Sequence, residues 1–90
     1  MAVTVICFTD HVREQMRARG ISAEIVVGVI ENPQQRVAAS KGRSAYQSRY
    51  FDPVEQTDML MRAIVEPRGA DLVVVSVYKT SRIAKYWLEA

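Results

Sequence analysis

Residues 59–79 read MLMRAIVEPRGADLVVVSVYK, and the expected fold is built outward from this stretch. Two apolar runs, 59–66 and 72–79, flank the segment PRGAD at 67–71. Proline and glycine between two runs rich in β-branched residues are typical of a tight connection between strands. The run that begins at Leu72 is apolar at four successive positions, which favours an interior strand covered on both faces. The stretch therefore predicts a pair of antiparallel strands, the second of them inside a sheet.

Two helices are predicted before the strands. Thr9 or Asp10 can cap the first helix, because either side chain offers an oxygen to backbone N–H groups that lack a partner. Gly20 provides a left-handed end to this helix. The second helix is expected from the capping residue Ser22 to Glu31, because the residue before a proline leaves the helical region. Its predicted buried face consists of Ile25, Val26, Val29 and Ile30.

Two more strands complete the expected sheet. Residues 34–40 and 44–51 are joined by a hairpin turn at 41–43, which contains a glycine. Residues 2–8 are compatible with a short strand or an extended arm, and residues 81–90 with a short helix or an edge strand. Two helices followed by an antiparallel meander predict an α+β domain, with both helices packed on one face of a roughly four-stranded sheet. With 90 residues, the whole chain forms one domain.

Cysteine and histidine usage excludes several kinds of site. The single cysteine, Cys7, cannot form an internal disulfide, and one cysteine with one histidine cannot supply the four ligands of a structural zinc site. The sequence also lacks a phosphate-binding glycine loop and an HExxH pair. We therefore expect no metal and no cofactor. Cys7 lies in an apolar run, so we expect a buried and inert thiol.

The opening apolar run has no basic lead-in, and no stretch approaches the roughly twenty apolar residues of a membrane span. The expectation is a cytoplasmic protein that does not contact a membrane. The net charge is +2, and arginine and lysine are concentrated in the first helix and the hairpins. A mildly basic surface suits a partner that bears phosphate.

The only histidine, His11, begins a row on the first helix. Gln15 and Arg19 follow at steps of four residues, and side chains at that spacing lie on one helical face. Imidazole titrates near neutral pH, so this row combines an acid or base, an amide and a fixed cation. Such a set would serve a nuclease that needs no metal. The alternative is a histidine near the helix cap beside ordinary surface charges.

Arg62 is a charged residue inside an apolar strand, between Met61 and Ala63. A charge in that setting must be paired or lie at an open cleft. One alternative is a salt bridge at the rim of the core with Glu66 or Asp58. The other is a contact with phosphate.

The next strand carries a second group of polar residues. Strand alternation places Ser76 and Tyr78 on one face and the apolar Val73, Val75 and Val77 on the other. We expect His11 to line a groove between the first helix and the sheet that also receives Tyr78 or Ser76, with Arg62 nearby.

Several short motifs resemble those of domain-of-unknown-function family 4258, a group of small bacterial proteins. The motifs, which span roughly residues 8–80, are Phe8-Thr9, His11, Met16, Arg19-Gly20-Ile21, Asn32-Pro33 and Ser76-Val77-Tyr78. The resemblance implies the barnase-like or RelE-like fold, whose members are mostly metal-independent ribonucleases and toxin components. The chain departs from the family pattern at Gln15, where an arginine is usual, and at Ser76, where threonine is usual.

The leading hypothesis is a metal-independent, toxin-type ribonuclease domain, in which the ribose 2′-hydroxyl attacks the adjacent phosphorus. His11, Tyr78 and Ser76 would transfer protons or orient the substrate. The residues assigned to phosphate or RNA binding are Arg19, Arg62, Gln15 and Lys79. The expected partners are RNA and a cognate antitoxin or another protein. The alternatives are a non-catalytic module of the same fold that binds protein or RNA, and a structural homodimer.

Overall fold

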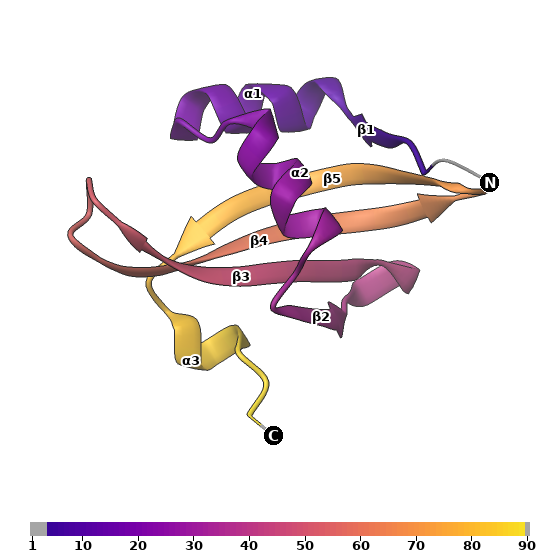
Figure 1. Cartoon of the computed structure of the whole chain (residues 1–90). Coiled ribbons are helices and arrows are strands. Elements are labelled where there is room, and N and C mark those ends of the chain that lie inside the picture. Colours follow the sequence, from indigo (N-terminus) through magenta and orange to yellow (C-terminus); the bar gives the residue numbers. More distant parts are fainter. Residues whose placement is uncertain (1–3, 90) are drawn as a thin grey trace.

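The computed structural model describes residues 4–89, which form one sheet of five strands and three helices (Figure 1). A short turn of 3-10 helix joins β2 to β3 at Ser40–Gly42. The elements in chain order are β1 (Ile6–Phe8), α1 (Asp10–Arg19), α2 (Ala23–Glu31), β2 (Gln35–Ala38), β3 (Ser44–Asp52), β4 (Thr57–Arg68), β5 (Asp71–Thr80) and α3 (Ile83–Tyr86).

The strand order in the sheet is β1-β5-β4-β3-β2, and β1 runs parallel to β5 while all other pairs are antiparallel. The expected four-stranded antiparallel sheet is therefore wrong in detail, because β1 adds a fifth strand and makes the sheet mixed. β1 pairs only with residues 72–74 of β5. Within residues 4–89, no strand pairs with the rest of that edge of β5.

A β-bulge in β5 changes which side chains share a face. Ile64 lies opposite Ser76 and the adjacent Val65 lies opposite Val74, so Val75 is the extra residue. The bulge moves Val73 to the face that carries Ser76 and Tyr78. The expected alignment of Val73, Val75 and Val77 on one face is wrong for this reason.

The helices begin and end at the predicted residues. Thr9 caps α1 by accepting a hydrogen bond from the N–H of Val12 at 3.1 Å, and Gly20 ends it with φ at 66°. Ser22 caps α2 by accepting from the N–H of Ile25 at 3.2 Å. Both caps satisfy N–H groups that the first helical turn leaves without a backbone partner.

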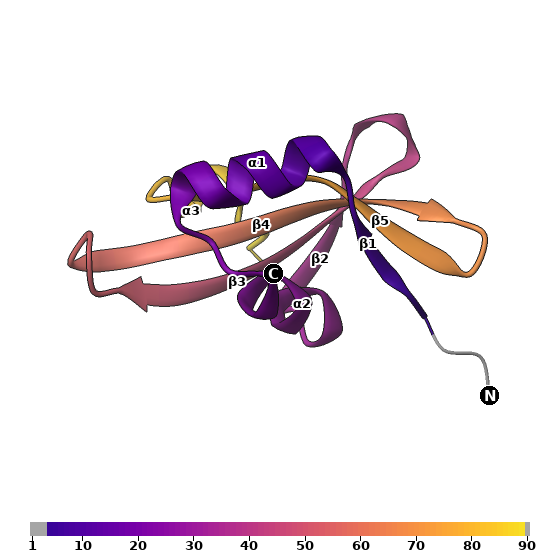
Figure 2. The ribbon, with the colours of Figure 1, turned by 90° about the horizontal axis from the view of Figure 1, so that it is seen from above.

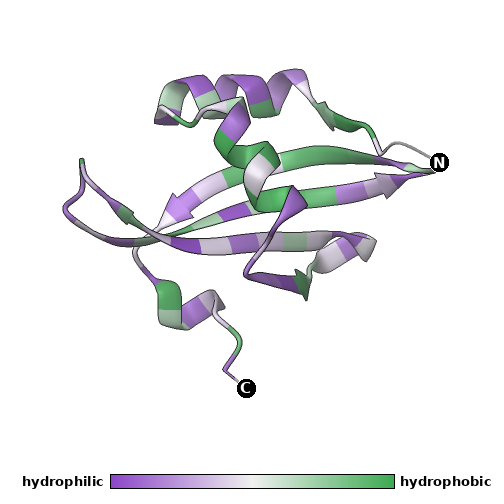
Figure 3. Ribbon diagram, viewed as in Figure 1, coloured by the Kyte–Doolittle hydropathy of each residue, from purple (hydrophilic) through white to green (hydrophobic). Residues whose placement is uncertain are grey.

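The main core lies between the sheet and the first two helices. α2 covers one face of the sheet, whereas α1 runs along the β5 edge with its apolar side turned into the same core (Figure 1). The expected packing of both helices on one face is therefore wrong in detail, because α1 contacts mainly β5 at this edge. The facing parts of α2, β4 and β5 are apolar (Figure 3). The side chain of Ile25 was predicted to be buried, but Ile25 is 53% exposed. The buried core residues include Val12, Met16, Ile21, Val26, Val29, Ile30, Tyr46, Met61, Ala63, Val65, Val74 and Val77.

The third helix, α3, lies on the opposite face of the sheet from α2 (Figures 1 and 2). Its Tyr86 ring meets the Tyr78 ring of β5 edge-on, with centroids 6.1 Å apart. Residues 81–90 thus contain a short helix rather than an edge strand. The second face of the sheet is consequently covered in part, and Leu60 on that face is fully buried.

Two further observations bear on the sequence expectations. Cys7 is exposed on β1, so the expected burial of its thiol is wrong. Since β1 is an edge strand, one of its sides has no neighbour in the sheet. None of the helices in the described part of the chain is long and apolar enough to cross a membrane.

Candidate functional site

Two members of the predicted helical row bind the free edge of β5. The Gln15 side chain accepts a hydrogen bond from the N–H of Val77 at 3.2 Å, and Arg19 donates to the carbonyl of Val77 at 2.8 Å. Val77 is fully buried, and its backbone groups face the edge that β1 does not reach. Gln15 and Arg19 therefore supply the hydrogen bonds that a neighbouring strand would otherwise provide.

His11 belongs to the same row but lies apart from these contacts. Its side chain is exposed, and among residues 4–89 it forms no hydrogen bond and no ion pair. The helical spacing predicted a shared face for His11, Gln15 and Arg19, and the latter two do share a partner.

Arg62 forms the centre of a polar cluster on the face of the sheet that α3 covers. Its Nε donates to Oε1 of Gln47 at 2.9 Å, and another guanidinium nitrogen donates to the Tyr78 hydroxyl. Its Cζ lies 4.2 Å from the centroid of the Tyr86 ring, which is a cation–π contact. Arg62 is only 9% exposed. The structure thus brings Arg62 and Tyr78 together on the α3 face, whereas His11, which was expected to share a groove with them, forms no hydrogen bond with either among the described residues.

The alternative in which Arg62 forms a salt bridge with Glu66 or Asp58 is wrong. Glu66 pairs with Arg43 and Arg68 instead, each at 3.3 Å, and no carboxylate in the described residues lies within ion-pair distance of Arg62. A buried guanidinium without a carboxylate is unusual, since burial of a charge is costly unless other groups compensate. Here an amide oxygen, a hydroxyl and two aromatic rings provide that compensation.

Gln47 connects this cluster to the C-terminal segment. Its side chain is fully buried, and its Nε2 donates to Oε1 of Gln35 at 2.8 Å and to the Tyr86 carbonyl at 3.1 Å. Gln35 in turn donates to the carbonyl of Leu88 at 2.7 Å and accepts from its N–H at 3.0 Å. These hydrogen bonds fix α3 and the residues after it on the sheet.

The two tyrosines of the cluster have shifted pKa values of opposite sign. Burial raises the pKa of Tyr78 above the ordinary value of 10.0, although Arg62 acts in the other direction. The hydrogen bond with Tyr78 lowers the pKa of Tyr86, and the charges of Lys85 and Arg62 add to this effect. Two adjacent phenols thus differ in how readily each gives up its proton.

The remaining predicted residues divide between the two faces. Ser76 is half-buried and, by its register with Ile64, lies on the same face as Arg62. Lys79 lies on the α2 face, where its Nζ donates to Oδ2 of Asp52 at 2.9 Å. Lys79 therefore does not join the Arg62 cluster.

Sequence reasoning missed Gln35, Gln47 and the role of Tyr86. A glutamine between ordinary strand residues gives no signal of burial, and Tyr86 was assigned only to a segment that could be a short helix or an edge strand. The one available signal was Arg62 itself, because a charge inside an apolar strand requires polar neighbours. Among residues 4–89, no three His, Cys, Asp or Glu side chains gather as potential metal ligands.

Fold and site together define a small α+β domain with a mixed sheet, whose second face holds an arginine–tyrosine cluster beneath a C-terminal helix. The model of a family described as a domain of unknown function, DUF4258, matches residues 8–79. The chain belongs to this family, as its motifs indicated. No curated protein and no solved structure matches the chain.

Proposed function

We propose that this domain is a metal-independent ribonuclease that holds RNA on the α3 face, at the Arg62 cluster. The observation that supports the proposal is the buried guanidinium of Arg62, which has no carboxylate partner among the described residues and contacts two tyrosines. A cation that no protein anion neutralises favours a bound phosphate, because a phosphodiester supplies the missing negative charge.

The tyrosines provide the proton transfers that cleavage requires. In-line attack of a 2′-hydroxyl needs a base for its proton, an acid for the 5′-oxygen that leaves, and a cation for the phosphoryl oxygens. Tyr86, with its lowered pKa, suits the base, and Tyr78, with its raised pKa, suits the acid. Arg62 would donate to the phosphoryl oxygens. The α3 face would thus supply a base, an acid and a cation for cleavage without His11.

Flanking residues on the same face favour a single-stranded substrate. Arg49 lies on this face by its register with Leu60, and its Cζ is 5.3 Å from the centroid of the Trp87 ring. Phe51, two residues further along β3, is 58% exposed. Aromatic rings beside arginines stack unpaired bases and contact the backbone, largely without regard to sequence.

A cleavage and binding assay with labelled single-stranded RNA, in the presence of a chelator, tests the proposal. We expect cleavage by the parent protein, its loss in Tyr86→Phe and in Arg62→Gln, and RNA binding that weakens as salt increases. Arg49→Gln should weaken binding.

The control for this assay is Arg36→Gln. Arg36 also stacks on a tyrosine, with its Cζ 5.1 Å from the Tyr46 centroid, but it lies on the opposite face. Equal loss of binding in Arg36→Gln and Arg49→Gln would show that the α3 face is not the RNA surface. Loss of cleavage in His11→Ala but not in Tyr86→Phe would contradict the assignment of the base.

One observation favours a second candidate, a non-catalytic module of the same fold. The contacts of Arg62 with Gln47, Tyr78 and Tyr86 fasten α3 to the sheet, which is a structural role for the same guanidinium. In that case Arg62→Gln would lower stability, and the parent protein would bind RNA or a protein partner such as an antitoxin without cleaving RNA.

A further inference from the structure

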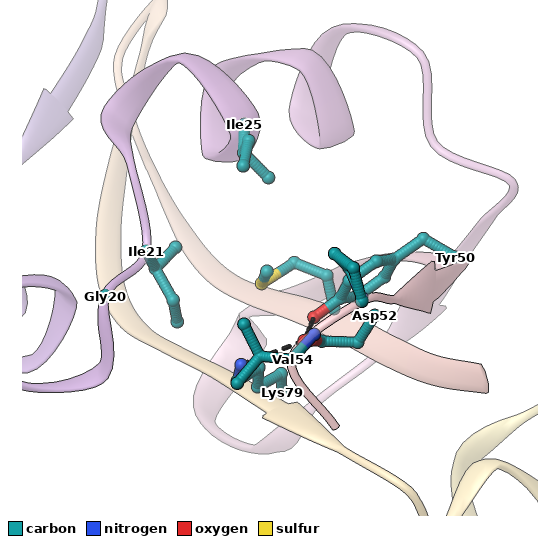
Figure 4. A pocket seen from close by; sticks show the side chains of 9 residues that line it. Gly20, Ile21, Ile25, Tyr50, Asp52, Val54 and Lys79 are labelled. Carbon is teal, nitrogen blue, oxygen red and sulfur yellow. Dashed lines mark hydrogen bonds and ion pairs between the residues drawn. The ribbon is translucent and has the colours of Figure 1, made fainter. Parts of the chain in front are cut away.

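A second candidate site lies on the α2 face, away from the Arg62 cluster. A pocket of about 390 Å³ opens between the start of α2 and the hairpin that joins β3 to β4. Ile21 and Ile25 lie across it from Tyr50, Asp52 and Lys79 (Figure 4). This volume is at the lower end of the range of small-molecule sites, about 300–1,000 Å³.

The base of the pocket is a fixed ion pair. Asp52 is 4% exposed, and its Oδ2 accepts from Nζ of Lys79 at 2.9 Å and from the Tyr50 hydroxyl at 3.1 Å. Its Oδ1 accepts from the N–H groups of Val54 at 2.9 Å and Glu55 at 3.1 Å. Both carboxylate oxygens therefore carry two hydrogen bonds each, and Asp52 has no acceptor capacity left for a ligand.

The ammonium of Lys79, by contrast, has unused donors. It carries three N–H groups, and within residues 4–89 it donates to Asp52 alone. Its side chain is 25% exposed, and it lines the pocket. Arg19, a second cation, donates to the carbonyl of Val77, two residues before Lys79 on the same strand. A ligand in the pocket must therefore present a hydrogen-bond acceptor at the end where Lys79 lies.

The rest of the pocket is apolar and partly open to solvent. Ile25 is 53% exposed and Val54 is 84% exposed, so two aliphatic side chains at the pocket contact water in the absence of a ligand. Covering them releases this surface from water, which favours binding of an apolar body. The buried side of the pocket is formed by Met61, which is only 4% exposed.

From these features we infer that the pocket binds a small carboxylate with an apolar body, with the carboxylate on Lys79 and the body between Ile25 and Val54. The two N–H groups of Lys79 that do not bind Asp52 can donate to a carboxylate, and such a charge-assisted hydrogen bond is stronger than one to a neutral acceptor. The apolar walls select a hydrocarbon chain or ring. This site lies on the other face of the sheet from the proposed RNA surface, so neither proposal depends on the other.

Titration of the ¹⁵N-labelled protein with sodium hexanoate, followed by amide chemical shifts, tests the inference. Hexanol and hexylammonium are the matched probes, because they share the chain and differ in the polar end. We expect saturable shifts at Ile21, Ile25, Val54 and Lys79 with hexanoate, in the millimolar range typical of so small a ligand. Hexanol should bind about tenfold more weakly, and hexylammonium should cause no saturable shift at these residues.

Two variants locate the binding. Ile25→Glu places a carboxylate at the pocket and should abolish the hexanoate shifts. Val5→Glu is its control, because Val5 is 50% exposed and does not line the pocket. Lys79→Met should remove the preference for hexanoate over hexanol. If Lys79→Met does not fold, the comparison of Ile25→Glu with Val5→Glu decides the location. Equal shifts with all three probes, no saturable shift with hexanoate, or equal effects of Ile25→Glu and Val5→Glu would overturn the inference.

Discussion

Gln47 is the residue whose replacement tests the polar cluster most directly. Gln47→Leu keeps the approximate size of the side chain but removes its oxygen and its amide group. The change leaves the Nε–H of Arg62 without its acceptor at 2.9 Å, and leaves the Tyr86 carbonyl without its donor at 3.1 Å. Because Gln47 is fully buried, water cannot replace these partners without a rearrangement of the segment above it.

The expected loss in the free energy of unfolding is about 2–3 kcal/mol. A hydrogen bond to a charged group contributes roughly 1.5–3 kcal/mol, and the orphaned carbonyl adds to the loss. The buried leucine offsets about 1 kcal/mol of it through its additional apolar surface. For a domain of this size, the sum corresponds to a fall in Tm of about 10–20 °C.

Two measurements check this prediction. Urea unfolding gives the change in free energy. The fluorescence of Trp87, the only tryptophan, reports whether the segment after α3 stays on the sheet, because Arg49 lies 5.3 Å from its ring. We expect a red-shifted emission for Gln47→Leu under native conditions. The control is Gln34→Leu, because Gln34 is exposed and its hydrogen bonds lie at the surface. Stability within about 0.5 kcal/mol of the parent would refute the reasoning that Gln47 holds the cluster together.

The other predictions concern the strand edge, the pH dependence of stability and the histidine. Gln15→Leu should cost about 1–2 kcal/mol in urea unfolding, because the buried N–H of Val77 loses its acceptor; an unchanged midpoint would mean that another group replaces it. The pKa of Asp52 lies well below its ordinary value of 3.8, chiefly because Lys79 donates to it, so its stabilising effect is present above about pH 4 and is lost as the pH falls further. Asp52→Asn should reduce the fall in the free energy of unfolding below about pH 4, and an equally steep fall in this variant would contradict the assignment. Burial and the hydrogen bond to Asp52 raise the pKa of Tyr50 from 10.0 to about 12, so its contribution is present below pH 10 and is lost as the pH rises toward 12; absorbance titration of Tyr50→Phe should lack one phenol that ionises near pH 12 in the parent protein. His11→Ala should change stability by less than about 0.5 kcal/mol, because the side chain has no partner among the described residues, and it should leave RNA cleavage intact if Tyr86 is the base.

Several parts of this protein followed from the sequence because their causes are local. A helix cap requires an oxygen within three residues of the N–H that it satisfies, so Thr9 and Ser22 could be read directly. Gly20 could be read for the same reason, since a left-handed backbone favours glycine. The hairpin of residues 59–79 was also local, because both strands and their turn lie in one short segment. The motifs that indicated the family likewise lie in short stretches of the chain.

Other features depend on residues that are distant in the chain. The parallel pairing of β1 with residues 72–74 joins the two ends of the sequence, and nothing within β1 identifies its partner. The bulge at Val75 reverses the face of Val73, because one extra residue shifts a two-residue repeat. Ile25 fits the apolar stripe of its helix, yet it is 53% exposed, because it lines the pocket at the start of α2 that is partly open to solvent.

The candidate site depends partly on the sequence and partly on the tertiary structure. The sequence alone indicated that Arg62 needs polar partners, because an apolar strand cannot solvate a guanidinium. Only the tertiary structure selected Gln47, Tyr78 and Tyr86 as those partners and left His11 out of the cluster. The physical reason is that hydrogen bonds and cation–π contacts depend on distances of a few ångströms between side chains. Those distances are set by strand register and by the packing of α3, neither of which is encoded in any single segment.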